Sequence, residues 1–156
     1  KGNLLIVEDN KEILEALDFK PYRSKVERRV IPLLPENGDP QTLEVKTPWG
    51  AVLTAKKGDF LVSEVSAPHD FWPIDPLIFE ESYLITRPGY CAKNAVTLLV
   101  PLTDVTDGDP DQKVTVVSLE GAETVRAGDF FLAKGVKGEI WPYPKGKIDE
   151  VMTPAE

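Results

Sequence analysis

The chain has 156 residues, of which 42% are hydrophobic, and this suits one globular domain or two small ones that share a core. The 26 acidic residues outnumber the 18 basic ones, and the formal net charge of −8 favours solubility and disfavours binding to nucleic acid or to an anionic membrane. Cys91 is the single cysteine, which excludes an intramolecular disulfide, and no apolar run reaches the ~20 residues that cross a bilayer. We therefore expect an acidic protein of the reducing cytoplasm.

The first predicted element is a strand followed by a helix, within residues 1–24. The run LLIVEDN ends in the acid pair Glu8 and Asp9, and Asp9 or Asn10 suits the N-cap of a helix. This opening resembles the first strand and helix of phosphoacceptor receiver domains, in which paired acids hold magnesium. The rest of the chain argues against a receiver. Asp59, in the window of the phosphoacceptor, lies in a Lys-Lys-Gly-Asp turn before a strand, and no alternation of strands with long helices follows.

A basic stretch, KPYRSKVERR, follows this element at Lys20–Arg29 and carries five basic residues. A charge run of this kind is usually a solvated face, and a local anion-binding patch is the alternative.

Two similar segments, 25–90 and 91–156, make up the remainder. Four short blocks recur in the same order at a spacing of about seventy residues, which indicates an internal duplication. The matched blocks are Pro32-Leu33 with Pro101-Leu102, Gly38-Asp39-Pro40 with Gly108-Asp109-Pro110, Gly58-Asp59-Phe60 with Gly128-Asp129-Phe130, and Trp72-Pro73 with Trp141-Pro142.

Each segment is predicted to consist mostly of strands. Gly-Asp-Pro and Gly-Asp-Phe are turn sequences, and TLEV and KVTVV alternate as half-buried strands do. In the second segment FFLAKGVKGEIWPY predicts a hairpin with its loop at Val136-Lys137-Gly138.

A short helix is predicted to close each segment. IDPLIFEESY begins with Asp75 as N-cap and places Leu77, Ile78 and Tyr83 on one side, whereas YPKGKIDEVM is a poorer helix because Gly146 replaces Leu77. We therefore predict a mainly β protein, with α+β as the alternative. It has two duplicated small units, barrel-like or curled sheets, each with a short terminal helix, and an N-terminal strand and helix beside them.

The block VRAGDFFLAKGVKGEIWPYPKGKIDEVM, and more loosely LTAKKGDFLVSEVSAPHDFWPIDPLIFEESY, resembles the small domain of bacterial and phage proteins named for its PGDYG motif. The shared features are a Gly-Asp-aromatic turn, a strand, a Gly-Glu hairpin, an aromatic-Pro pair and a Phe-containing helix before a Tyr. The second segment has Ile148 and Met152 where Phe and Tyr are usual, and the first lacks the Gly-Glu hairpin. The resemblance implies the fold and the duplication and lends no catalytic residue.

Common catalytic and cofactor motifs are absent from the sequence. One His and one Cys do not make a protein zinc site, and neither a nucleophile elbow nor a glycine-rich phosphate loop is present, so we expect no metal and no cofactor. His69 suits a loop and Cys91 a buried thiol.

The candidate binding residues are therefore the aromatic and acidic residues that recur in both segments, together with His69. They are Trp72, Trp141, Tyr143, Asp59, Asp129 and His69. An indole beside a proline offers a flat, rigid surface to a ligand ring or a partner peptide, or plugs the seam between the units. The first hypothesis is a noncatalytic module that binds a small molecule or a protein partner. The alternatives are a hydrolase acting on a sugar or nucleotide through paired carboxylates, and a phage-derived structural or accessory protein.

Overall fold

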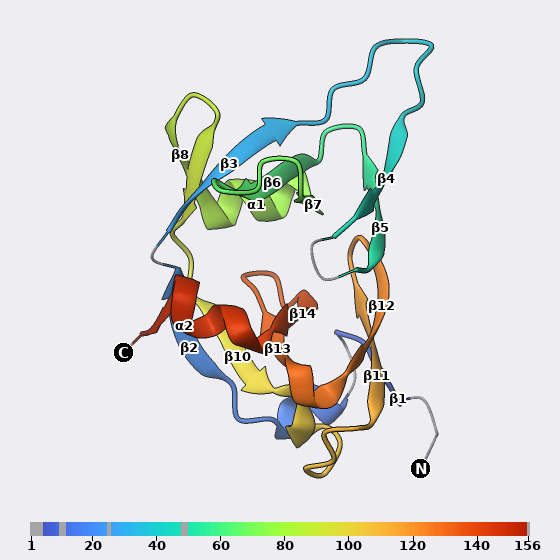
Figure 1. The fold of residues 1–156 in the computed structure, drawn as a ribbon, viewed down its shortest axis with the longest axis vertical. Coiled ribbons are helices and arrows are strands. Elements are labelled where there is room, and N and C mark those ends of the chain that lie inside the picture. The colour runs from blue at the N-terminus through green and yellow to red at the C-terminus, as the bar shows by residue number, and fades with distance from the viewer. Residues whose placement is uncertain (1–4, 10–11, 25, 48–49, 156) are drawn as a thin grey trace.

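A computed structural model of the chain describes residues 5–9, 12–24, 26–47 and 50–155. The fold is mainly β, as predicted, and Figure 1 shows two lobes stacked along the long axis. The described strands form two five-stranded sheets, a three-stranded sheet and a two-stranded sheet. None of these sheets closes into a barrel, so each unit is an open, curled sheet.

The upper lobe of Figure 1 is a continuous segment, residues 26–93. Its five-stranded sheet has the order β7-β6-β3-β9-β8, and the long hairpin β4-β5 projects from it. Its elements are β3 (Glu27–Pro32), β4 (Thr42–Lys46), β5 (Val52–Lys56), β6 (Phe60–Glu64), β7 (Phe71–Ile74), α1 (Pro76–Ser82), β8 (Tyr83–Arg87) and β9 (Tyr90–Lys93).

The lower lobe combines the two ends of the chain, residues 5–24 and 95–155. Its five-stranded sheet has the order β14-β13-β10-β2-β15, and β1 adds in parallel to the hairpin β11-β12. Its strands are β1 (Leu5–Val7), β2 (Lys20–Ser24), β10 (Thr97–Pro101), β11 (Lys113–Ser118), β12 (Gly121–Arg126), β13 (Phe130–Lys134), β14 (Ile140–Pro144) and β15 (Met152–Pro154). Its helical turns are η1 (Glu12–Ala16), η2 (Leu102–Asp104), η3 (Ala127–Asp129), η4 (Lys145–Lys147) and α2 (Ile148–Val151).

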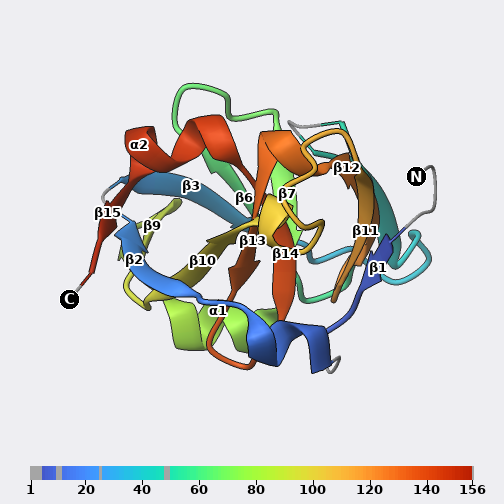
Figure 2. The same ribbon diagram turned by 90° about the horizontal axis from the view of Figure 1, so that it is seen from below.

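The two five-stranded sheets have the same strand order when each strand is matched with its sequence counterpart. β7, β6, β3 and β8 correspond to β14, β13, β10 and β15. The remaining strand is exchanged: β9 occupies in the upper lobe the place that β2, from the N-terminal segment, occupies in the lower lobe. Figure 2 shows β2 beside β10 and β15.

The register of the sheets determines which residues are equivalent. Val30 lies opposite Val62 in the upper sheet, and Leu99 lies opposite Ala133 in the lower one. Trp72 is in turn opposite Val62, and Trp141 is opposite Ala133, so the two tryptophans occupy equivalent places. The Gly-Asp-Phe blocks are shifted by one residue in the sheets, because Pro32 lies opposite Phe60 whereas Pro101 lies opposite Phe131 and not Phe130.

The N-terminal helix is shorter and tighter than predicted. η1 is a 3-10 turn in which Leu17 N donates to Leu14 O, and only Leu14 of its five residues is buried. Asn10, the alternative N-cap, lies outside the described residues. Leu14 is buried in the core of the lower lobe, and Ile13 and Leu17 pack against the same core from partly buried places.

The helix α1 forms where it was predicted, with Asp75 as its N-cap. The Asp75 carboxylate accepts hydrogen bonds from the backbone of Leu77 (2.9 Å) and Ile78 (3.4 Å). Leu77 is 61% exposed, whereas Phe79 fills the core and stacks on Phe60 at 4.1 Å. Its counterpart is broken into η4 and α2, as the glycine in its first turn predicts. No helix of the described segments is long and apolar enough to cross a membrane.

Candidate functional site

A cavity of about 110 Å³ lies between the two lobes. Both lobes contribute to its apolar wall, which includes Leu53, Ile74 and Ile78 from above and Leu119, Ile140 and Met152 from below. An apolar cavity of roughly 150 Å³ is known to hold benzene, so the space here matches a molecule of about one ring.

The two equivalent tryptophans, Trp72 and Trp141, both line this cavity. Each indole ring has a cation of the protein near its face. The Arg28 guanidinium lies 5.5 Å from the centroid of Trp72, and the Lys93 ammonium lies 4.7 Å from the centroid of Trp141. Cation–π attraction of this kind holds a charge near an apolar wall where water is scarce.

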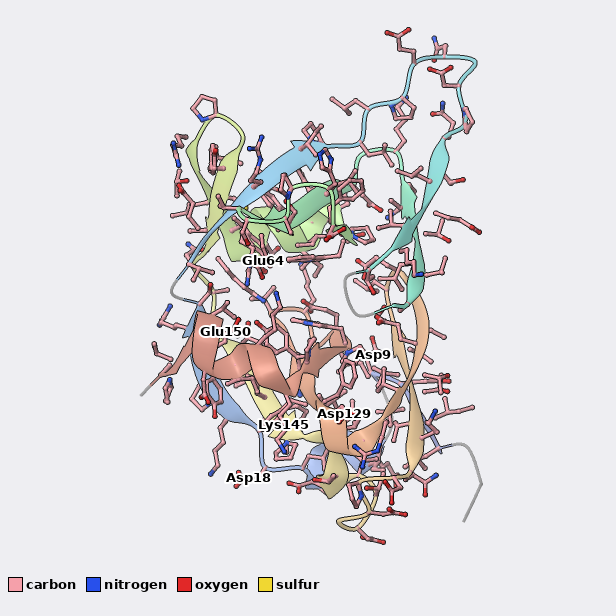
Figure 3. All side chains as sticks on the ribbon, in the orientation of Figure 1. Asp9, Asp18, Glu64, Asp129, Lys145 and Glu150 are labelled. Atoms are coloured by element: carbon pink, nitrogen blue, oxygen red, sulfur yellow. The ribbon has the colours of Figure 1, made fainter. Side chains whose placement is uncertain are left out.

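Arg28 and Glu64 form a buried ion pair at the upper side of the cavity. Arg28 Nε donates to Glu64 Oε1 at 3.0 Å, and Lys147 Nζ from the lower lobe donates to Glu64 Oε2 at 2.9 Å. Figure 3 shows Glu64 on the face of the upper lobe that is turned toward the lower lobe. Burial by itself would raise the pKa of Glu64, but the hydrogen bonds and charges of Arg28 and Lys147 outweigh it and lower the pKa. Glu64 therefore links the lobes as a carboxylate.

Lys93, at the end of β9, is the third cation of the cavity wall. Its ammonium lies over the rings of Trp141 and Tyr83, the latter at 5.8 Å. No carboxylate of the described residues lies within the 4.0 Å ion-pair distance of its nitrogen. Burial is the main cause of a fall in the pKa of Lys93 to about 8; the Glu139 carboxylate opposes this fall and Arg28 adds to it.

Glu139 brings a buried carboxylate to the same cavity. It is 6% exposed, and its Oε1 accepts a hydrogen bond from Lys137 N at 2.8 Å. Its Oε2 is buried and has no hydrogen-bond partner among the described residues. The carboxylate packs against Gly135, where a Cβ would collide with Oε2, so a residue other than glycine at 135 would displace it.

Glu120 lies at the turn between β11 and β12 and also lines the cavity. Its Oε2 accepts a hydrogen bond from Asp75 N at 3.2 Å. Burial raises the pKa of Glu120 to about 7, the hydrogen bond from Asp75 N opposes the rise, and the charges of Asp59 and Asp75 increase it. The cavity thus contains both a weakened acid and a weakened base.

The recurring aspartates of the sequence, Asp59 and Asp129, do not line the cavity. Each forms an ion pair with the cation three residues earlier, Asp59 with Lys56 at 2.9 Å and Asp129 with Arg126 at 3.0 Å. Asp59 is fully buried and also accepts a hydrogen bond from Lys56 N, whereas Asp129 is largely exposed in the lower lobe (Figure 3). Both therefore serve the turns before β6 and β13.

The other candidates from the sequence are distributed over different places. Tyr143 lines the cavity, and burial raises the pKa of its hydroxyl to about 12. His69 is exposed in the loop before β7, and Cys91 is buried with its pKa raised to about 11 by burial. The acid pair Glu8 and Asp9 borders a second hollow of about 200 Å³, which shares Glu139 and Ile140 with the first cavity.

The sequence patterns did not indicate the seven charged residues of the described chain that line the cavity, which are Arg28, Glu64, Lys93, Glu120, Glu123, Glu139 and Lys147. Arg28 was part of the basic stretch Lys20–Arg29, which the structure places in β2 and β3, and Glu139 was part of the Gly-Glu hairpin. No sequence motif indicates a role for Lys93 or Glu120, because these residues lie at strand ends that are brought together only by the stacking of the lobes.

Comparisons of the chain with models of protein families, with curated proteins and with solved structures give no match. The described residues contain no group of three or more His, Cys, Asp or Glu side chains arranged to hold a metal ion. The geometry of the cavity is therefore what indicates a function.

Proposed function

We propose that the chain is a noncatalytic binding protein that holds a small molecule in the cavity between its lobes. The observation that carries this proposal is the pair of tryptophans, Trp72 and Trp141, which occupy equivalent places in the two sheets and line one cavity. Small-molecule sites are mostly apolar hollows between structural units, with a few polar groups that fix orientation.

The polar groups of the cavity support a ligand rather than a plug between lobes. Lys93 has no ion-pair partner within the described residues, and Glu139 Oε2 is buried without a hydrogen bond. A seam that served stability alone would satisfy such groups or replace them with apolar ones, because buried unpaired polar atoms cost about 1 to 3 kcal/mol each. A molecule in the cavity would supply a partner to Lys93.

A small molecule fits the cavity better than a protein partner does, because the space lies between the walls of both lobes and matches about one ring. We assign no hydrolytic step to Asp59 or Asp129, since each forms an ion pair within its own turn.

We also infer that the lobes arose by internal duplication and that the chain is related to the PGDYG-motif domains of bacterial and phage proteins. The common strand order of the two five-stranded sheets supports the duplication. The relation to the PGDYG-motif domains rests on the shared motifs.

A cavity-filling variant tests the binding proposal. Ile78 lines the cavity, whereas Leu77, its neighbour on α1, is exposed and does not, so Ile78→Trp and Leu77→Trp form a matched pair. We expect small neutral aromatics such as benzyl alcohol to raise the melting temperature of the wild type and of Leu77→Trp, but not of Ile78→Trp. At ten times Kd the shift corresponds to about 1.4 kcal/mol, or roughly 3 to 6 °C for a chain of this size.

The same shift in both variants would place the probe outside the cavity. The absence of any shift with a panel of single-ring probes, in a wild type that is folded, would contradict the proposed function.

A further inference from the structure

Three cations of the described residues line the cavity, and they differ in whether they have an ion-pair partner within the protein. Arg28 and Lys147 both pair with Glu64, at 3.0 and 2.9 Å. Lys93 is different, because the described part of the chain offers its ammonium no hydrogen bond and no carboxylate within 4.0 Å. Three N–H donors therefore remain for a bound molecule.

The aromatic faces of the cavity are already in contact with cations. Arg28 lies over Trp72, and Lys93 lies over Trp141 and Tyr83. A cationic ligand on these faces would meet like charge, whereas an anion would be attracted by both cations. Burial is the main cause of the lowered pKa of Lys93, and an anion beside the ammonium would stabilise its charged form.

Four carboxylates also line the cavity, those of Glu64, Glu120, Glu123 and Glu139, and of these four described residues only Glu139 has a buried oxygen without a hydrogen bond. Its Oε2 is buried and unpartnered, but its Oε1 already accepts the backbone N–H of Lys137 at 2.8 Å. Because the Lys93 ammonium and the Glu139 carboxylate do not pair directly, a ligand can place its anionic group at Lys93 and its uncharged end toward Glu139.

We propose that the ligand of this cavity is a small aromatic carboxylic acid of one ring, whose carboxylate binds the Lys93 ammonium and whose ring lies among Trp72, Trp141 and Tyr83. The inference rests on the proposed function, because it names the ligand class of the same cavity. The volume of about 110 Å³ sets the size, the rings of the wall set the aromatic character, and the unpaired ammonium sets the charge.

The first test compares three probes of similar size, benzoate, benzyl alcohol and benzylamine, by calorimetry on the wild-type chain at pH 7. A charge-assisted hydrogen bond in a partly enclosed site strengthens binding by about tenfold or more, so benzoate should bind at least tenfold more tightly than benzyl alcohol. Benzylamine should bind most weakly.

Two lysine variants show whether Lys93 is responsible. Lys93→Met keeps the length of the side chain and removes its charge. Lys134→Met is the matched control, because the Lys134 ammonium also lies over a ring, that of Phe19 at 5.4 Å, but does not line the cavity. The preference for benzoate should vanish in Lys93→Met and remain in Lys134→Met.

Measurements of binding to the wild type over a range of pH also show whether the charge of Lys93 causes the preference for benzoate. The pKa of Lys93 is about 8, so benzoate should bind progressively more weakly between pH 8 and 9.5, where Glu120, with its pKa of about 7, is already ionised, while the affinity for benzyl alcohol stays constant. The other groups around Lys93 are Glu139, Arg28 and Tyr83. The pKa values of Arg28 and Tyr83 are raised above their ordinary values, so these two groups do not titrate in this interval.

The outcomes separate this inference from the proposed function. Equal affinities for benzoate and benzyl alcohol, tighter binding of benzylamine, or an unchanged preference in Lys93→Met would overturn the anionic ligand while leaving a binding cavity. Failure of all three probes to bind the folded wild type would contradict both proposals.

Discussion

Replacing Glu64 with Gln removes the negative charge that lies between two cations of different lobes. Glu64 accepts hydrogen bonds from Arg28 on β3 and from Lys147 on η4, and the Arg28 side chain is only 7% exposed. The variant leaves the guanidinium buried without a counter-ion. We expect the free energy of unfolding to fall, mainly because the Arg28 guanidinium loses its ion-pair partner.

The size of the loss follows from burial. Breaking a buried pair by removing one partner costs about 3 to 5 kcal/mol. The Gln amide oxygen still accepts one hydrogen bond, and the Glu64 side chain is 19% exposed, so we expect about 2 to 4 kcal/mol for Glu64→Gln. Lys147→Met removes a partner that is 33% exposed and should cost less than about 1 kcal/mol.

Urea denaturation followed by tryptophan fluorescence measures both variants. The double variant Arg28→Met/Glu64→Leu should be more stable than Glu64→Gln, because it removes the buried guanidinium together with its partner and leaves only Lys147, which is 33% exposed, without an ion pair. The lowered pKa of Glu64 means that its ion pairs stabilise the fold above the unfolded-state pKa, near 4.5, and that this contribution is lost as the pH falls through the folded-state value. A Glu64→Gln chain that is as stable as Lys147→Met would refute the argument.

Two further predictions concern Glu120 and Asp75. Burial raises the pKa of Glu120 to about 7, so the wild type should lose stability as the pH rises from 4.5 through 7, and Glu120→Gln should abolish that slope in urea denaturation at pH 5 and pH 8. An unchanged slope would show that other groups cause it. Asp75→Ala removes the N-cap of α1 and should cost about 1 kcal/mol in the same assay, whereas Asp70→Ala, in an exposed loop, should cost almost nothing. Equal stability of these two variants would contradict the capping role.

Local sequence chemistry predicted the elements that local interactions form. Asp75-Pro76 predicted the start of α1, and the Val136-Lys137-Gly138 loop predicted the hairpin of β13 and β14, because capping and turn geometry depend on a few adjacent residues. Trp72 and Trp141 were recognised as a pair because each is followed by proline in a repeated block.

The charged part of the cavity could not be predicted in this way. Lys93 and Glu120 are far apart in the chain, and nothing in their neighbouring residues indicates that stacking of the lobes buries both. Asp59 and Asp129 show the converse, since a shared Gly-Asp-Phe motif suggested a common site although each motif serves its own turn. Periodicity also could not show that β2 pairs with β10 rather than with β3.

The exchange of β2 and β9 has a consequence for the order of events on the ribosome. The strands of the upper lobe lie in one uninterrupted segment, so its sheet can be completed as soon as β9 has emerged. β2 is synthesised before that whole lobe, yet both its sheet neighbours, β10 and β15, come after it. At about 5 to 20 residues per second, β2 must remain unpaired for several seconds of translation. Nascent chains stalled after β9 should therefore carry a protease-resistant upper lobe and a cleavable N-terminal segment.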